Sequence, residues 1–374
     1  MKYRGFNFLF LANVASRVGN SIYESALVWW MVKLSQNAES ASYAMSSSFL
    51  SAAVFGLFVG VALDRFNKKC ILVLSDLFGA AIMFLMAALA HQGKFDVGAI
   101  VLTNVLLGFG VATVKPAIKS ILPDLVPKER ILFSNLLIGN LGTIARIVGP
   151  LISSFLLLKF DTPMTIVLLV NAISFVISAF FEWMIPIKTE IQKRSRRFSV
   201  REVLGGFTSL RDSKKLLLIV HIFLSDFFII SFLILLPALS KAIPSLNVYG
   251  YSFGLSFYSG GFVFSTLLFL LKELKPSLKT LYLFQYISAV PLLGIFIFPN
   301  LYFVLGCCFV FGVTVSIAGA VFNGYLQAYV EKDSIGRVFS FIQFVGMMLV
   351  PLSYLLFGNL STGHERLCFL IAAL

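Results

Sequence analysis

Charge is scarce in this chain of 374 residues, since only 13% of the residues are Asp, Glu, Lys or Arg and 59% are hydrophobic. Soluble globular domains carry about 25% charged residues, which they need to cover a surface that faces water. The mean hydropathy of +0.93 points the same way. This composition excludes a soluble protein and leaves little chain for a separate soluble catalytic domain.

Cysteine and histidine are also few, with four and three residues respectively. No Cys-x-x-Cys pair occurs, and the histidines are scattered, which argues against a disulfide framework and a metal site. The chain has no Gly-x-x-x-x-Gly-Lys-Ser/Thr loop for ATP and no His-Glu-x-x-His pair. We therefore expect no enzyme, no metal and no cofactor.

Long apolar runs fill the chain instead, each near the roughly 20 residues that a helix needs to cross a bilayer. The amino-terminal run is longer than a signal-peptide core and has no cleavage site of small residues, so the first helix is expected to be retained. The last run begins near Leu367 and holds only a few residues, so we expect the sequence to stop inside its final helix. The runs predict helices at 6–33, 42–63, 70–91, 97–115, 132–158, 163–185, 215–242, 249–271, 279–298, 301–328 and 337–360.

The formal net charge is +13, which raises the question of nucleic-acid binding. Most lysines and arginines lie in loops on one side of the predicted helices, with no folded basic module, so nucleic-acid binding is not expected. The positive-inside rule places these loops and the amino terminus in the cytoplasm. We expect a multi-pass membrane protein whose basic loops contact anionic lipid headgroups.

A polar segment divides the apolar runs into two groups. The expected organisation is an amino-terminal bundle at 1–186, a cytoplasmic linker at 187–214 and a carboxyl-terminal bundle at 215–374. Apolar residues at helical spacing in the linker favour a short amphipathic surface helix, and a plain solvated linker is the alternative. A faint repeat supports two halves, because Phe109-Gly110-Val111 recurs as Phe311-Gly312-Val313.

A glycine, an acid and a basic turn follow the second predicted helix. The motif residues are Gly60, Asp64, Arg65, Lys68 and Lys69. The sequence here resembles the major facilitator superfamily, whose signature in this loop has this form. The resemblance implies an all-α integral membrane protein of two six-helix bundles, with these residues as a cytoplasmic gate.

Within that superfamily the chain looks most like bacterial macrolide exporters. Segments that carry this resemblance are Ser16–Trp30, Asp76-Leu77, Pro116-Ala117, Leu122–Pro127, Gly149-Pro150 and Asn171–Phe175. The resemblance implies a monomer of the bacterial cytoplasmic membrane that exports lipophilic, macrolide-like or cationic drugs by alternating access. The export would be driven by the proton gradient. Two departures put proton antiport in doubt: Asn104 stands where many proton-driven members have arginine, and the helix-packing motif of the fifth helix is reduced to Gly149-Pro150.

Ionisable residues at membrane depth cost at least about 2.5–3.5 kcal/mol each, so they usually face water or a partner. The candidates for proton or substrate binding are Arg17, Glu24, Arg146, His221 and Asp226. Glu24 and Asp226 lead, because the resembled fold lines its central cavity with the helices that carry them. Static pairs that only hold helices together are the alternative. Asp76, near the cytoplasmic end of the third helix, is assigned to the gate with Asp64.

Two other functions stay open at this stage. One keeps the fold and exports an endogenous siderophore, lipid or peptide. The other is a membrane scaffold or receptor that transports nothing, which the complete gate motif disfavours. The 40 phenylalanines would suit a cavity for bulky lipophilic compounds, but lipid-facing and packing roles explain most of them.

Overall fold

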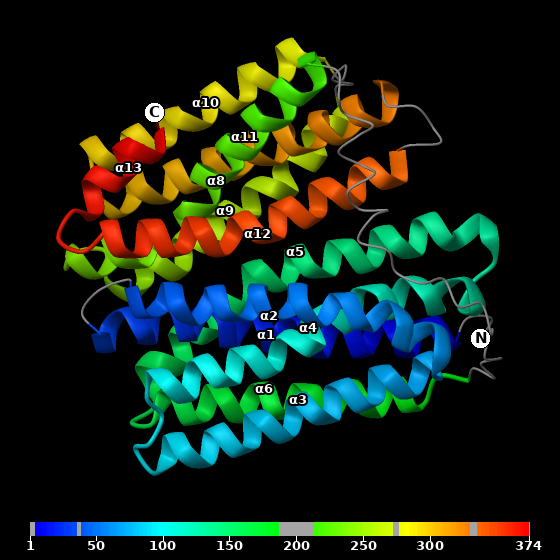
Figure 1. Cartoon of the computed structure of the whole chain (residues 1–374). Helices are drawn as coiled ribbons and strands as arrows, with labels where there is room; N and C mark the ends of the chain where they lie inside the picture. Colours follow the sequence, from blue (N-terminus) through cyan, green and yellow to red (C-terminus); the bar gives the residue numbers. More distant parts are fainter. Residues whose placement is uncertain (1–3, 36–38, 187–212, 272–276, 330–334, 374) are drawn as a thin grey trace. The chain divides into compact units, whose positions relative to one another are not determined.

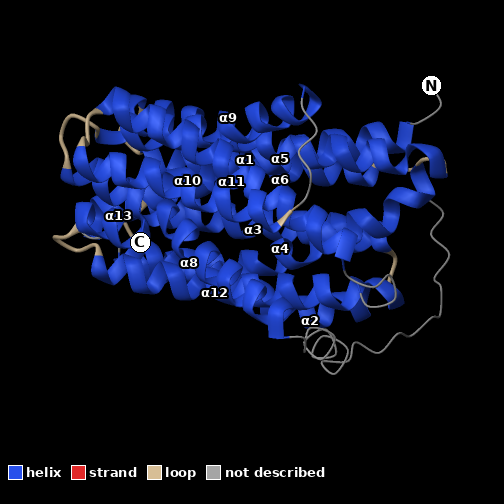
Figure 2. Cartoon of the chain, turned by 90° about the horizontal axis from the view of Figure 1, so that it is seen from above, coloured by secondary structure: helices blue, strands red, loops and turns tan. Residues whose placement is uncertain are grey.

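The computed structural model describes residues 4–35, 39–186, 213–271, 277–329 and 335–373. These residues form 12 α-helices and no strand, so the predicted all-α fold is confirmed. Helix accounts for nearly all of the described chain (Figure 2). The amphipathic helix expected at 187–214 falls almost entirely outside the described residues.

The helices follow the apolar runs closely (Figure 1). Those before the linker are α1 (Arg4–Ser35), α2 (Glu39–Arg65), α3 (Lys68–His91), α4 (Val97–Leu125), α5 (Lys128–Lys159) and α6 (Pro163–Trp183). Those after it are α8 (Ser213–Ala242), α9 (Asn247–Leu271), α10 (Leu278–Ile297), α11 (Leu301–Tyr329), α12 (Ile335–Leu360) and α13 (Glu365–Ala373). Seven of the described helices are long and apolar enough to cross a membrane.

Local chemistry sets several helix ends. The side chains of Asn67, Asp96 and Ser277 accept hydrogen bonds from the first free backbone N–H groups of α3, α4 and α10. Such caps satisfy donors that have no partner inside the helix. Gly93 follows α3 with a φ of 72°, a left-handed conformation that side chains disfavour, and it turns the chain toward α4.

Helix α4 corrects the predicted boundary at residue 115. A proline inside a helix has no N–H to donate and disfavours the helical conformation of the preceding residue. In the structure the helix continues through Pro116 and Pro123 to Leu125. Its last turns bury Ile121 and Leu122 to 0% and 1% exposure, and this packing outweighs the lost backbone hydrogen bonds.

The chain divides into two compact units. Unit 1 comprises Met1–Trp30 with Ser47–Phe198, and unit 2 comprises Met31–Ser46 with Ser199–Leu374. The end of α1 and the start of α2 thus belong to unit 2. There Lys241 Nζ donates to the Val32 carbonyl at 2.7 Å, in the last turn of α1, and Ser46 Oγ donates to the Pro351 carbonyl at 3.3 Å.

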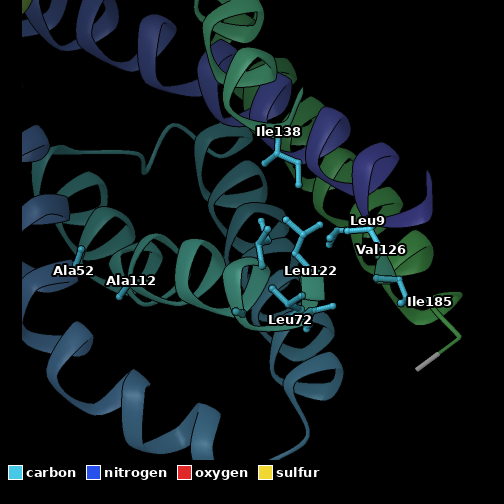
Figure 3. Packing of buried hydrophobic residues seen from close by; sticks show 11 residues of the cluster. Leu9, Ala52, Leu72, Ala112, Leu122, Val126, Ile138 and Ile185 are labelled. Carbon is cyan, nitrogen blue, oxygen red and sulfur yellow. The ribbon is translucent and has the colours of Figure 1, made fainter. Parts of the chain in front are cut away.

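The core of unit 1 gathers side chains from both ends of its sequence (Figure 3). Leu9 of α1, Leu72 of α3 and Leu122 of α4 lie in one buried cluster with Ile138 of α5. Ile185, just beyond α6, belongs to the same cluster. Helix α3 packs most extensively against α6, and the two lie side by side in Figure 1.

Unit 2 has its own core, formed by Ile222 of α8, Leu281 of α10 and Val321 of α11 among others. Its most extensive helix pair is α9 with α11. The backbones of these two helices meet at glycines: a Cβ on Gly312 would lie 2.8 Å from the carbonyl carbon of Tyr258, and one on Gly261 would lie 2.9 Å from that of Gly312. Only glycine permits this approach.

Candidate functional site

Helix α1 presents two of the predicted ionisable residues. Arg17 is half-buried and Glu24 is exposed, and their spacing of seven residues places them on one face of the helix. The Arg17 guanidinium lies against α5, since a Cβ on Gly142 would be 2.7 Å from Arg17 Nη1. Arg17 Nε also donates a long hydrogen bond of 3.4 Å to Asn13 Oδ1.

Arg146 of α5 joins these residues, one helical turn beyond Gly142. Its side chain is exposed and lies within electrostatic range of both Arg17 and Glu24. Among the described side chains, none of these three forms an ion pair within 4.0 Å. The geometry therefore brings together three of the predicted residues without locking them in a static salt bridge.

Two lysines near the predicted end of the fourth helix belong to the same surface. Because α4 continues through Pro116, Lys115 and Lys119 lie inside the helix, and both side chains are exposed. Lys115 is within electrostatic range of Arg17, Arg146 and Lys119. We call Arg17, Lys115, Lys119 and Arg146 the basic surface of unit 1.

In unit 2, Asp226 is exposed on α8, and the neighbouring Phe227 carbonyl accepts a hydrogen bond of 2.6 Å from Ser353 Oγ of α12. His221 lies on the same helix but points to α10. Its Nε2 is 3.2 Å from Gln285 Oε1, and its ring packs edge-on against Tyr282 with centroids 5.0 Å apart. His221 therefore packs against α10.

The first two residues of α3, which belong to the predicted gate motif, contact the ends of two other helices. Lys68 Nζ donates to the Ser120 carbonyl at 2.9 Å and lies 3.9 Å from Asp124 Oδ2, both near the end of α4. Lys69 Nζ donates to the Ile185 carbonyl at 2.8 Å, just beyond α6. A lysine near a helix carboxyl end satisfies a free carbonyl and complements the helix dipole.

We expect Lys69→Met to lower the thermal midpoint of the purified protein, because the Ile185 carbonyl loses its donor at a cost of about 1 kcal/mol. Lys94→Met is the matched control, since Lys94 is exposed in the turn between α3 and α4. Thermal unfolding in detergent would measure both variants. Equal midpoints for the two would show that the Lys69 contact contributes nothing to stability.

The remaining gate residues, Gly60, Asp64 and Arg65, fall in the part of α2 whose side chains lie outside the described structure. Their predicted role stays a prediction. Asp76, assigned to the same gate, is buried to 2% exposure between α3 and α6, with Ser178 as its hydrogen-bond partner.

A second buried acid, Glu182, lies near Asp76, and the sequence analysis did not select it. A Cβ on Gly79 of α3 would touch Phe175 of α6 at 3.2 Å, while Asp76 bonds Ser178, so the two helices run antiparallel with these residues in register. Glu182 follows Ser178 by one turn, is 3% exposed, and interacts electrostatically with Asp76. One oxygen of each carboxyl group has no hydrogen-bond partner among the described atoms.

Asn104, where many proton-driven relatives of the resembled family carry arginine, contacts α1. It is 4% exposed, and its Oδ1 accepts a hydrogen bond of 3.3 Å from the hydroxyl of Tyr23. The residue is thus part of the α1–α4 contact in unit 1. It adds no charge to the basic surface.

Gly149 and Pro150 lie on α5 where it crosses α1. A Cβ on Gly149 would lie 2.6 Å from Ser21 Cβ, and one turn further Ser25 Oγ donates to Ser153 Oγ at 3.0 Å. The absent side chain of Gly149 therefore allows the two helices to approach closely, as small residues do in membrane bundles.

Comparisons with known proteins agree with this architecture. Residues 9–353 match the sequence profile of the Major Facilitator Superfamily. Macrolide efflux protein A of Streptococcus pyogenes is 22% identical over 360 residues, covering 94% of this chain and 88% of that protein. Macrolide efflux protein A of Enterococcus faecalis is 23% identical over 313 residues, covering 81% of this chain and 95% of that protein.

Among solved structures, a mutant of the nucleoside transporter NupG has the same fold, with a TM-score of 0.77 and 13% identity, covering 99% of this chain and 96% of that chain. Membrane helices, family match and efflux relatives together identify a membrane transporter and not an enzyme. The chain belongs to the Major Facilitator Superfamily.

Proposed function

We propose that this transporter is a monomeric exporter of lipophilic small molecules, macrolide-like compounds among them, driven by the proton gradient. Its place would be the bacterial cytoplasmic membrane, with the amino terminus in the cytoplasm. The observation that carries the proposal is the exposed group of ionisable side chains on α1, α4 and α5, at depths where the chain is otherwise apolar. The similarity to macrolide efflux proteins supports the direction of transport.

Exposed charges inside spanning helices need water. A charge that faces lipid costs at least about 2.5–3.5 kcal/mol. Glu24, Lys115 and Arg146 come from three different helices, and Arg146 interacts electrostatically with both of the others, so the three side chains lie near one another in unit 1. A surface of this kind supports an aqueous path for cargo.

Glu24 supplies a carboxylate on this surface, and Asp226 supplies an exposed one on unit 2. A carboxylate binds either a proton or a cationic group of the cargo. Because the two compete for one site, cargo binding displaces the proton, which is the exchange that a proton-driven exporter needs. Glu24 and Asp226 are the residues that we propose for this exchange.

The test is efflux of erythromycin and ethidium from energised cells that express the intact protein, with and without a protonophore. We expect Glu24→Gln or Asp226→Asn to lower the efflux rate by about tenfold or more, a change of about 1.4 kcal/mol in the barrier. Asp161→Asn, in the exposed turn before α6, is the control and should match the unmodified protein.

Two results would contradict the proposal in different ways. If efflux continues in the presence of the protonophore and in both variants, transport needs neither the proton gradient nor the two carboxylates. No efflux of either compound by well-folded intact protein would contradict export of such drugs. That result would favour an endogenous cargo, or a scaffold that transports nothing.

A further inference from the structure

The basic surface of unit 1 carries more positive charge than its acid can balance. Lys115 interacts electrostatically with Arg17, Arg146 and Lys119, and the acid Glu24 interacts with Arg146. Like charges held together repel one another, and the low dielectric of the surrounding protein strengthens the repulsion. The excess of charge therefore favours a bound anion.

The contacts of these side chains leave donors available. In the described structure Arg17 makes a 3.4 Å bond to Asn13, and Arg146 Nη2 makes a bond of the same length to Thr143 Oγ1. Both partners are neutral residues of the same helix, and both bonds are longer than the usual 2.7–3.2 Å. The remaining guanidinium N–H groups can form short charge-assisted bonds with an anion.

The backbone of α5 leaves room for one of these guanidinium groups. Gly142 of α5 leaves the space that Arg17 Nη1 occupies, because a Cβ there would lie only 2.7 Å away. One turn along the same face of α5 is Arg146. Two guanidinium groups are thus positioned from α1 and α5, with Lys115 approaching from α4. Carboxylate and phosphate groups match the planar fork of arginine.

We infer that the basic surface of unit 1 binds an anionic group, so that the compounds this protein exports include lipophilic molecules bearing a carboxylate, phosphate or similar group. This inference rests on the proposed export function and adds an anionic class to its cargo. An interior-negative membrane potential favours the exit of such a molecule by about 2.3 kcal/mol per charge for each 100 mV. A cargo with both an acid and an amine would also engage Glu24.

The test compares two probes that share a ring and a chain but differ in the sign of their charge. They are pyrenebutyrate and pyrenebutyltrimethylammonium, titrated into the purified full chain in phosphatidylcholine nanodiscs, with empty nanodiscs subtracted. We expect the anion to bind at least about tenfold more tightly than the cation, since a hydrogen bond to a charged group contributes about 1.5–3 kcal/mol.

Substitutions then locate the site. Lys115→Gln and Arg146→Gln should each weaken pyrenebutyrate binding by about tenfold. Lys159→Gln is the matched control, because Lys159 is an exposed cation at the far end of α5, and it should bind as the unmodified protein does. Size-exclusion chromatography establishes that each variant is folded. If a glutamine variant fails to fold, the charge-retaining Arg146→Lys replaces it, with a smaller loss expected because lysine lacks the fork.

The same titration in nanodiscs that contain phosphatidylglycerol separates the two sources of an anionic group. Displacement of pyrenebutyrate by this lipid would support the anion site and identify the anion as a lipid headgroup, whereas undisturbed binding would identify a soluble cargo. Equal affinity for both probes, or binding that survives both glutamine substitutions, would overturn the inference. The titration measures binding and not transport. Its outcome therefore tests the anion site even if the efflux experiment finds no export.

Discussion

Gly312→Val should abolish correct folding of the transporter, with little or no monodisperse protein recovered after solubilisation. The side chain would meet the backbone of α9, where the Tyr258 carbonyl carbon lies 2.8 Å and its Cα 3.1 Å from the position of a Cβ. Backbone atoms cannot rotate aside as a flexible side chain can. Overpacking costs about 1–3 kcal/mol in ordinary cores, and we expect the upper end or more here.

Gly319→Val is the matched control for this substitution. It lies on the same helix, α11, and a Cβ there meets nothing within 4 Å. Both changes add the same β-branched side chain and the same change in intrinsic helix propensity, so these contributions cancel in the comparison. Fluorescence-detected size-exclusion chromatography and thermal unfolding would compare them. If the two variants behaved alike, the close approach of α9 and α11 would have no energetic importance.

Ser178→Ala and Glu182→Gln should change stability in opposite directions. Alanine at 178 removes a hydrogen-bond partner of the buried Asp76, and a buried polar group left without its partner costs about 1–3 kcal/mol. Glutamine at 182 removes an acid that interacts with Asp76 while keeping the size and polarity of the side chain. Two carboxyl groups buried together each disfavour ionisation of the other, which costs folding free energy. Replacing one of them by a neutral amide removes that cost.

Thermal midpoints in detergent would test this pair of variants. Ser174→Ala is the control, since this serine lies one turn earlier on α6 and donates to the Asn171 carbonyl of its own helix at 2.8 Å. We expect a lower midpoint for Ser178→Ala than for the control, and a higher midpoint for Glu182→Gln than for the unmodified protein. A lower midpoint for Glu182→Gln would mean that its carboxyl group stabilises the α3–α6 contact.

The helices were predictable from the sequence because each apolar run is long enough to be a helix by itself. The predicted end at residue 115 was too early, because the extent of α4 depends on burial of Ile121 and Leu122 against other helices. That error also left Lys119 outside the predicted helix and Lys115 at its last position. A lysine pair four residues apart is compatible with either reading until the helix boundary is known.

The internal repeat shows a second limit of local patterns. Gly110 and Gly312 occupy equivalent places in Phe-Gly-Val, yet only Gly312 meets a neighbouring backbone closely. The nearest atom to a Cβ on Gly110 is Ser75 Oγ, at an ordinary distance of 3.6 Å. On α4 the close approach is instead at Gly108, where a Cβ would lie 2.9 Å from Ser51 Cβ.

The sequence by itself determined the class of the protein: hydropathy, the spacing of apolar runs and the motif around Lys68 and Lys69 depend on residues close together in the chain. Only the tertiary structure decided which side chains meet. Arg17 lies against Gly142, and Asp76 lies near Glu182, because helices far apart in sequence pack in one particular register. Helical periodicity tells which residues share a face of one helix, but the partner of that face depends on the free energy of packing the whole unit.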